Sequence, residues 1–109
     1  MQKAEIPPGT LEMLVLKTLA RFGAMHGYAI AKSILQISDE VLKVEEGSLY
    51  PALQRILIKG WVTAEWVPAG PKRRARVYEL TAEGRRQLSS ELAEYRRVAQ
   101  AIERVIQPA

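Results

Sequence analysis

The sequence predicts a mainly α-helical protein that carries one β-hairpin, which places it in the α+β class. Three observations support this prediction. Apolar residues recur at helical spacing in three segments before residue 60. From Trp61 the spacing changes to alternation over two short runs, which a turn-rich segment separates. Helical spacing then returns after residue 81 and continues almost to the C-terminus, which indicates a long final helix.

The composition is that of an ordinary globular protein. A chain of 109 residues, 48% of them apolar and 26% charged, fits one domain with at most a long appended element. Cysteine is absent, which excludes disulfides and thiolate metal sites and fits a reducing cytoplasm. The N-terminal residues MQKAEIPPG contain no apolar signal-peptide core, and no run of about 18 apolar residues occurs. We therefore expect a cytoplasmic protein without a membrane segment.

The first two helices follow from apolar spacing and from the residues that bound them. The first is predicted over residues 10–22, where apolar residues recur at i, i+3, i+4 and i+8, with Thr18 at i+7. Thr10 is its expected N-cap and Gly23 its stop. After a very short link, the apolar face of residues 27–37 predicts a second helix. The charged segment that follows is too short for another helix, and we expect a brief extended piece at residues 41–44.

The third helix carries a proline, and the position of the proline decides where the helix begins. If Ser48 is the N-cap, Pro51 falls in the first turn, where its missing N–H had no helical partner anyway. The clash of the ring with the carbonyl four residues earlier also disappears, because Gly47 then lies outside the helix. We therefore expect this helix to begin at Gly47 or Ser48.

One side of the third helix is apolar, and the other is polar and cationic. The inner side comprises Leu49, Leu53, Ile56 and Leu57. The outer side comprises Ser48, Pro51, Gln54, Arg55 and Lys59. Arginine and glutamine can read guanine and adenine edges in the major groove of DNA. An ordinary solvated helix has a similar face, so this helix alone leaves both interpretations open.

A β-hairpin with a basic tip is predicted after the third helix. Residues 61–67 and 75–80 form its strands, and PAGPKRR supplies two prolines and a glycine for the turn. The net charge of the chain is +4, and residues 72–76 (KRRAR) alone carry four positive charges. A positive field this local indicates a polyanionic partner, although a solvated basic loop has the same composition. Trp61 and Trp66 lie on opposite faces of an ideal strand, so one of them is expected to be exposed.

The final helix carries a narrow apolar stripe. Thr81 is its expected N-cap, and apolar residues then recur at spacings of 4, 3, 4, 3 and 4, which is typical of a coiled-coil seam. The predicted dimer seam comprises Leu88, Leu92, Tyr95, Ala99, Ile102 and Ile106. At about 1.5 Å per residue, a helix of about 25 residues is about 37 Å long, more than so small a core can cover. A second copy of the chain is the expected partner.

In this order the elements describe a winged helix-turn-helix with a long C-terminal dimerisation helix. The third helix is expected to enter the major groove, while the hairpin, or wing, lies along the phosphate backbone. The wing cations that displace condensed counterions there are Lys72, Arg73, Arg74 and Arg76. We expect residues 1–81 to form the DNA-binding domain and residues 82–109 the dimerisation helix. A two-fold dimer would read a roughly palindromic double-stranded operator.

An enzyme is not expected. His26 is the single histidine, and no glycine-rich phosphate loop, metal-ligand spacing or nucleophile pair occurs. No catalytic residue, metal site or cofactor is therefore predicted. The alternative is a winged helix that binds another protein and not DNA. The two differ in salt dependence, because DNA affinity that rests on phosphate contacts falls steeply as salt is added.

Four sequence blocks resemble the PadR family of transcriptional regulators, in its short type with one C-terminal helix. They are GTLEMLVLKTLA, HGYAIAKSI, VEEGSLYPALQRI and RRARVYELTAEGR, and they cover about residues 9–88. The resemblance implies a winged-helix domain, a dimer held by the last helix, and repression of transcription.

Carried over by position, the resemblance also implies DNA-contacting residues. It places Gly27 and Tyr28 at the start of the second helix, beside the phosphate backbone. It assigns to the recognition helix Ser48, Tyr50, Pro51, Gln54 and Arg55, and to the wing Lys72, Arg73, Arg74 and Arg76. The final helix lacks the tryptophan that in some relatives stacks on a flat ligand. A cavity between the final helices and the domains could still hold an apolar or aromatic effector.

Overall fold

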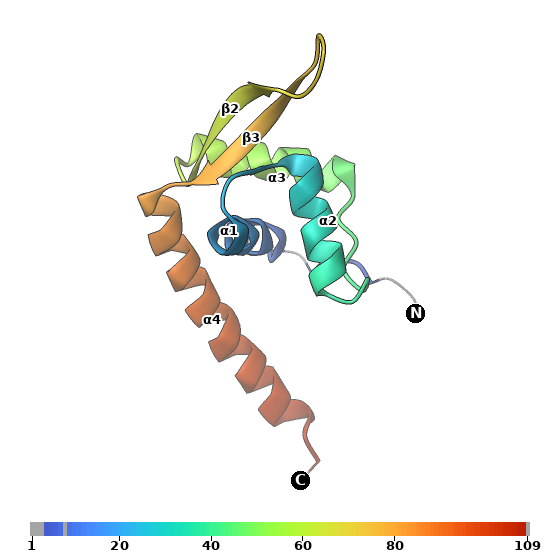
Figure 1. Ribbon diagram of the computed structural model, residues 1–109. Coiled ribbons are helices and arrows are strands. Elements are labelled where there is room, and N and C mark those ends of the chain that lie inside the picture. The colour runs from blue at the N-terminus through green and yellow to red at the C-terminus, as the bar shows by residue number, and fades with distance from the viewer. Residues whose placement is uncertain (1–3, 8, 109) are drawn as a thin grey trace.

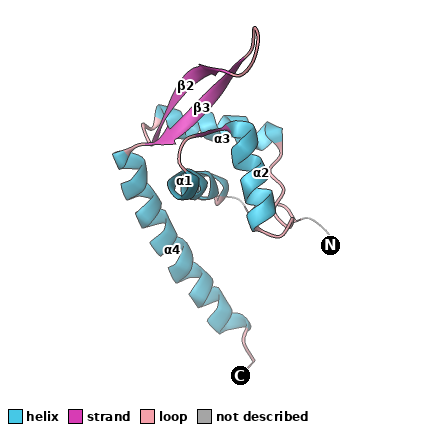
Figure 2. Ribbon diagram, in the orientation of Figure 1, coloured by secondary structure: helices cyan, strands magenta, loops and turns pink. Residues whose placement is uncertain are grey.

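The structure, a computed structural model, describes residues 4–7 and 9–108 and has a mixed α/β architecture (Figures 1 and 2). Its elements are α1 (Leu11–Phe22), β1 (Met25–His26), α2 (Gly27–Ile37), α3 (Glu46–Ile58), β2 (Val62–Pro68), β3 (Arg74–Leu80) and α4 (Ala82–Ile106). The predicted fold class is confirmed. Residues 1–3 and 8 of the predicted first domain, and residue 109, lie outside this description. Within the described ranges, no helix has the length and apolar character that crossing a membrane requires.

Helix α1 is the centre of the core. It packs against α2, α3, α4 and β3, and the side chains of Val15 and Leu16 have no exposed surface. The core residues from the other elements are Ile30 and Ile34 of α2, Leu49, Leu53 and Ile56 of α3, Val62 and Tyr78 of the sheet, and Leu88 of α4. Thr18 is the buried polar residue of this helix, and its hydroxyl donates to the Leu14 carbonyl at 2.7 Å. A helix with one apolar face therefore organises the whole domain.

The sheet has a third strand that the sequence did not predict. Strand β3 lies between β2 and β1, and both pairings are antiparallel. In the register of β1, Met25 pairs with Tyr78 and His26 with Val77. From the sequence, these two residues are expected to form part of a short link. Two residues are too few to show an alternating pattern, so only the fold reveals this strand.

The start of α3 corrects the sequence prediction. The helix begins at Glu46, with Glu45 and not Ser48 as its N-cap residue. Pro51 therefore lies inside the helix, and the prediction that it falls in the first turn is wrong. The proline removes the amide that would bond the Gly47 carbonyl. Gly47 and Pro51 both lie on the exposed side, where water can replace that amide.

At the N-terminal side, one detail differs from expectation and one agrees with it. Thr10 stands at the N-cap position of α1, but its hydroxyl donates to the Pro7 carbonyl at 2.7 Å and makes no cap hydrogen bond. The expected extended piece is present as an isolated bridge, in which Leu42 pairs in parallel with Ala4. The Ala4 amide donates to the Val41 carbonyl at 2.7 Å. The N-terminal segment thus returns to the link before α3, a contact between residues too distant in sequence to be read from spacing.

Helix α4 is joined to the domain by a close contact. The Thr81 hydroxyl accepts from the Gly84 amide at 3.0 Å, which confirms the predicted cap, and it donates to the Gly60 carbonyl at 2.8 Å. The Thr81 amide donates to the Trp61 carbonyl at 3.0 Å. A Cβ at Gly84 would overlap the Trp61 carbonyl oxygen and would lie 2.9 Å from the carbonyl carbon. The absence of a side chain at Gly84 therefore allows α4 to begin directly against the link between α3 and β2.

Candidate nucleic-acid interface

The exposed side of α3 is a nearly uncharged stripe. Gly47, Pro51, Gln54 and Ile58 follow one another at spacings of 4, 3 and 4, and all are exposed. They lie opposite the buried residues Leu49, Ala52, Leu53 and Ile56. Pro51 and Gln54 are expected on this side from the sequence, but Ile58, whose side chain is 76% exposed, is not. Its position four residues after Gln54 was the signal that could have found it. We call Gly47, Pro51, Gln54 and Ile58 the outer stripe.

Two predicted cations of α3 lie on the flank of this stripe, beside α1. Arg55 Nε donates to Glu12 Oε2 at 2.9 Å, and Lys59 Nζ donates to Glu12 Oε1 at 3.2 Å. Partial burial raises the pKa of Glu12, and the hydrogen bonds and charges of Arg55 and Lys59 lower it further than burial raises it. The net effect is a pKa below the ordinary value, so Glu12 is ionised at neutral pH.

The opposite flank of α3 meets the start of α2. Gly27 is buried, and a Cβ there would lie 3.2 Å from the Tyr50 ring and 3.2 Å from Leu53. Gly27 thus serves the packing of α2 on α3, while the predicted contact residue Tyr28 beside it is exposed. Tyr28, Lys32 and Tyr50 line one part of a groove of about 520 Å³ between α2 and the start of α3, and Lys43, Glu45 and Glu46 line its other part, before and at the start of α3. The two phenols and the ammonium give this flank hydrogen-bond donors that suit phosphate oxygens.

The wing carries its cations on a tight loop, residues 69–73. The Ala69 amide donates to the Arg73 carbonyl at 3.0 Å, and the Arg73 amide donates to the Gly70 carbonyl at 3.2 Å. Gly70 and Lys72 both have positive φ values, of 129° and 60°. Lys72, Arg73 and Arg74 are exposed. Figure 1 shows this loop at the far end of the hairpin, beyond the body of the domain.

Stacking on a tryptophan orders the arginines of β3. Trp66 lies directly opposite Arg76 in the register, and its side chain is 56% exposed. The guanidinium carbons of Arg74 and Arg76 lie 5.4 and 5.7 Å from the Trp66 ring centre, and Arg76 also lies 5.9 Å from Tyr78. Arg76 is half-buried, and its Nε has no hydrogen-bond partner among the residues that the structure describes. Such contacts contribute about 0.5–1 kcal/mol each at exposed sites, enough to favour one arrangement of these side chains.

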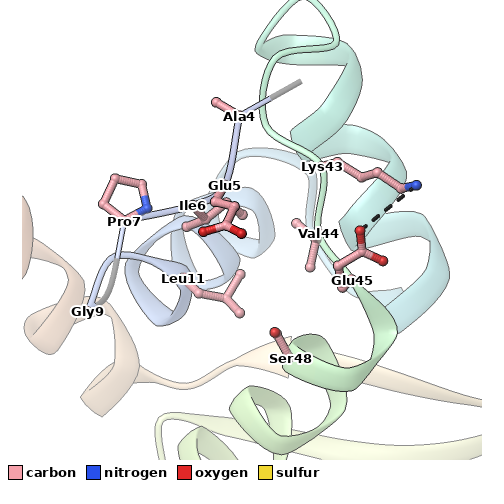
Figure 3. A pocket seen from close by; sticks show the side chains of 10 residues that line it. All are labelled: Ala4, Glu5, Ile6, Pro7, Gly9, Leu11, Lys43, Val44, Glu45 and Ser48. Carbon is pink, nitrogen blue, oxygen red and sulfur yellow. Dashed lines mark ion pairs between the residues drawn. The ribbon is translucent and has the colours of Figure 1, made fainter. Parts of the chain in front are cut away.

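A separate hollow does not belong to this interface. It has a volume of about 510 Å³ and lies between the N-terminal segment and the residues leading into α3 (Figure 3). Its lining includes Glu5, Lys43 and Glu45, and the Lys43 ammonium lies 3.9 Å from the Glu45 carboxylate. Two carboxylates against one ammonium do not suit a phosphate backbone. The described residues also hold no group of three or more His, Asp or Glu side chains that could ligate a metal.

Comparisons with known proteins agree with this geometry. The transcriptional regulator PadR-like family matches residues 15–90. A transcriptional regulator from Clostridium thermocellum has a similar structure, with a TM-score of 0.83 and 24% identity over 91% of this chain and 95% of that one. A PadR family regulator from Eggerthella lenta gives a TM-score of 0.77 and 30% identity over 93% of this chain and 85% of that one.

A third similar structure contains DNA. Bacillus subtilis PadR, in complex with operator DNA, gives a TM-score of 0.70 and 26% identity over 79% of this chain and 48% of that one. No curated protein matches the chain. The matching family is one of transcriptional regulators and not of enzymes, which confirms the expectation that this protein has no catalytic role. With a match that spans residues 15–90 and a winged-helix fold, the chain belongs to the PadR-like family of transcriptional regulators.

Proposed function

We propose that the protein is a homodimeric repressor that binds a roughly palindromic double-stranded operator. One observation carries the DNA-binding part: α3, with its exposed outer stripe, packs against β2, and β2 pairs with β3, which carries wing cations. Bacillus subtilis PadR, a similar structure in complex with operator DNA, supports this proposal. Residues 1–81 would form the DNA-binding domain and residues 82–109 the dimerisation helix. The cytoplasm is the proposed location, because there a regulator meets the DNA.

The outer stripe suits base recognition in the major groove. Gln54 offers the carboxamide that pairs with adenine N6 and N7, and Ile58 offers an apolar surface for a thymine methyl group. Gly47 and Pro51 have no long side chains, so the backbone of α3 can approach the bases closely. Phosphate contacts are proposed for Lys72, Arg73, Arg74 and Arg76 of the wing, for Tyr28 of α2 and for Tyr50 of α3. Ser48, on the flank that also carries Arg55 and Lys59, would donate to the nearer phosphates.

An uncovered apolar face on α4 supports the dimer. Leu88 is buried in the core of its own chain, so it has little surface left for a partner. Beyond it, Tyr95, Val98, Ile102, Val105 and Ile106 are all exposed. A contiguous apolar face of this kind marks an interaction site, and a second copy would bury it. Tyr95 lies at the domain side of this face, where we propose that an apolar or aromatic effector binds.

Selection of binding sites from a random DNA pool tests the proposed function. A dimer should recover a motif with two inverted half-sites about 34–36 Å apart, or a multiple of that distance. Affinity for the motif should fall steeply with salt, because each neutralised phosphate adds about 0.9 to the slope of log K against log salt. A protein-binding winged helix would yield no motif and no such slope.

Replacing Gln54 with alanine should relax base preference at one position of each half-site. The lost carboxamide pair corresponds to about 1–3 kcal/mol of discrimination against the wrong base. The measurement is a repeated selection with the variant, together with titrations of single-base operator variants. Gln36→Ala, an exposed change on α2, is the matched control and should leave the motif intact. An unchanged motif for Gln54→Ala would remove this residue from the reading surface.

Replacing Ile102 with glutamate should convert the dimer into a monomer, because the seam would bury two uncompensated carboxylates. Sedimentation velocity should show the lower mass, and operator affinity should drop because only one half-site is held. Gln100→Glu introduces the same charge on the opposite side of α4 and should keep the dimer. A dimeric Ile102→Glu variant would place the interface elsewhere.

A further inference from the structure

A single carboxylate on α1 holds two cations of α3. Glu12 uses one oxygen for Arg55 Nε at 2.9 Å and the other for Lys59 Nζ at 3.2 Å. Arg55 and Lys59 are four residues apart, so they lie on the same flank of α3, next to the outer stripe. The Glu12 side chain is only 21% exposed, against 52% for Arg55 and 45% for Lys59. The carboxylate is therefore the inner, fixed member of this group.

The contacts draw both cations toward α1 and away from the outer stripe. Arg55 is engaged through Nε, the nitrogen nearest its stem, which fixes the direction of the whole guanidinium. Lys59 is held at two points, because its ammonium also lies 4.5 Å from the centre of the Trp61 ring. Cationic side chains of α3 without a partner in the protein would bind any nearby phosphate. Arg55 and Lys59 instead already have acidic or aromatic partners within the protein.

Phosphate attraction by free cations raises affinity for random DNA most, because no base contact fixes the register there and a free cation can follow the nearest phosphate. On the operator the base contacts of α3 fix the register, so a freed cation gains less there, whereas on random DNA it strengthens binding and steepens the salt dependence. Because genomic DNA offers a vast excess of random sites, such attraction lowers the useful discrimination of a regulator. A carboxylate that neutralises cations on the recognition helix has the opposite effect.

We propose that Glu12 is a specificity-determining residue of this regulator, which acts by holding Arg55 and Lys59 so that they do not bind phosphates indiscriminately. Glu12 is a positioning residue, since it acts through two other side chains and touches no base itself. The inference rests on the proposed DNA-binding function. It explains why an acidic side chain points at the cationic flank of a helix that is proposed to enter the groove of a polyanion.

A purely structural role predicts a different outcome. Ion pairs with exposed partners contribute little to stability, so the folding of the domain does not require this arrangement. Glutamine at residue 12 keeps the size and hydrogen-bonding oxygen of the side chain and removes only its charge. A structural role would therefore change the unfolding midpoint, if anything, and would leave the salt dependence of DNA binding as it is.

The test compares Glu12→Gln with the wild-type protein on the selected operator and on a random duplex of equal length, over a series of salt concentrations. Binding of the variant to random DNA should tighten, and its salt slope should steepen by about 2 per protomer, since two cations are released. The ratio of random to operator Kd should fall by about tenfold. An unchanged slope, or an unchanged ratio, would overturn the proposal.

Two controls separate this effect from other causes. Glu40→Gln makes the same change in net charge at an exposed position after α2, and it should alter neither the slope nor the ratio. In a background of Arg55→Gln and Lys59→Gln, the further change Glu12→Gln should have no effect on random-DNA binding, and any effect there would contradict the proposal. If wild-type protein showed no salt-dependent DNA binding, the proposed function itself would fail. Normal wild-type binding with an unaffected Glu12→Gln variant would overturn the Glu12 inference alone.

Discussion

Alanine at Gly84 is expected to destabilise the protein strongly, although alanine is the better helix former by about 1 kcal/mol. The added Cβ would overlap the Trp61 carbonyl oxygen, which also accepts the Thr81 amide, and would lie 2.7 Å from Leu80 Cδ1. The Cβ would clash with the backbone of Trp61 and with the side chain of Leu80. Because the backbone cannot turn aside as a side chain can, the clash is removed only if α4 moves away from the domain. We expect a loss of roughly 3 kcal/mol in the free energy of unfolding. Urea unfolding followed by circular dichroism measures it.

Gly47→Ala is the matched control for this substitution. Gly47 lies near the start of α3 at negative φ, and a Cβ there would meet nothing within 4 Å. The free energy of unfolding should therefore stay the same or rise by about 0.5–1 kcal/mol, because alanine restricts the unfolded chain. A Gly84→Ala variant as stable as this control would show that the contact between α4 and the Trp61 carbonyl can relax freely.

Neutralising the wing loop should cause the largest loss of DNA affinity. In a variant with Lys72, Arg73 and Arg74 changed to glutamine, three exposed cations are removed from each protomer. At about 0.9 per phosphate contact, the slope of log K against log salt should become shallower by about 2.7 per protomer. The loss should be nearly equal for operator and random DNA, because phosphate contacts carry no sequence information. Titrations on both duplexes over a salt series provide the measurement.

A variant with the same loss of charge on α4 controls for net charge. Arg96, Arg97 and Arg104 are exposed and lie on the part of α4 that leaves the domain, and their replacement by glutamine should change the slope little. A wing-loop variant that lost operator binding but kept random-DNA binding would mean that these residues read bases. That result would reverse the proposed roles of α3 and the wing.

The elements with a one-sided pattern could be predicted from the sequence. Helices α1 and α2 each have one apolar and one polar face over about three turns. At Trp61 the spacing of apolar residues changes from helical to alternating, which marks the start of the hairpin. The start of α3 was misplaced because Ser48 is a preferred capping residue and Glu45 is not, although the helix uses Glu45. Leu42 and Val44, just before the helix, pack against the core, which spacing alone does not reveal.

The parts of the site that could not be predicted depend on contacts between distant residues. Glu12 pairs with Arg55 and Lys59 across more than forty positions, and no spacing rule reports such a pair. In the sequence, Gly84 is an ordinary glycine near the start of a helix. Only the structure shows that the Trp61 carbonyl lies too close to allow a side chain there. The outer side of α3 can be recognised as polar from the sequence, whereas Ile58, the most exposed apolar residue of α3, is assigned to neither side.

The joint at Thr81 makes α4 a stiff arm. Thr81 is hydrogen-bonded both to the first turn of α4 and to the chain between α3 and β2. We therefore expect a tilt of α4 to be transmitted to the domain. Over the about 37 Å of α4, a tilt of roughly 5° at the joint corresponds to about 3 Å at the far end. In the proposed dimer, a small shift where the two α4 helices meet would change the separation of the two α3 helices, so an effector bound between the α4 helices would control how well the dimer fits its operator.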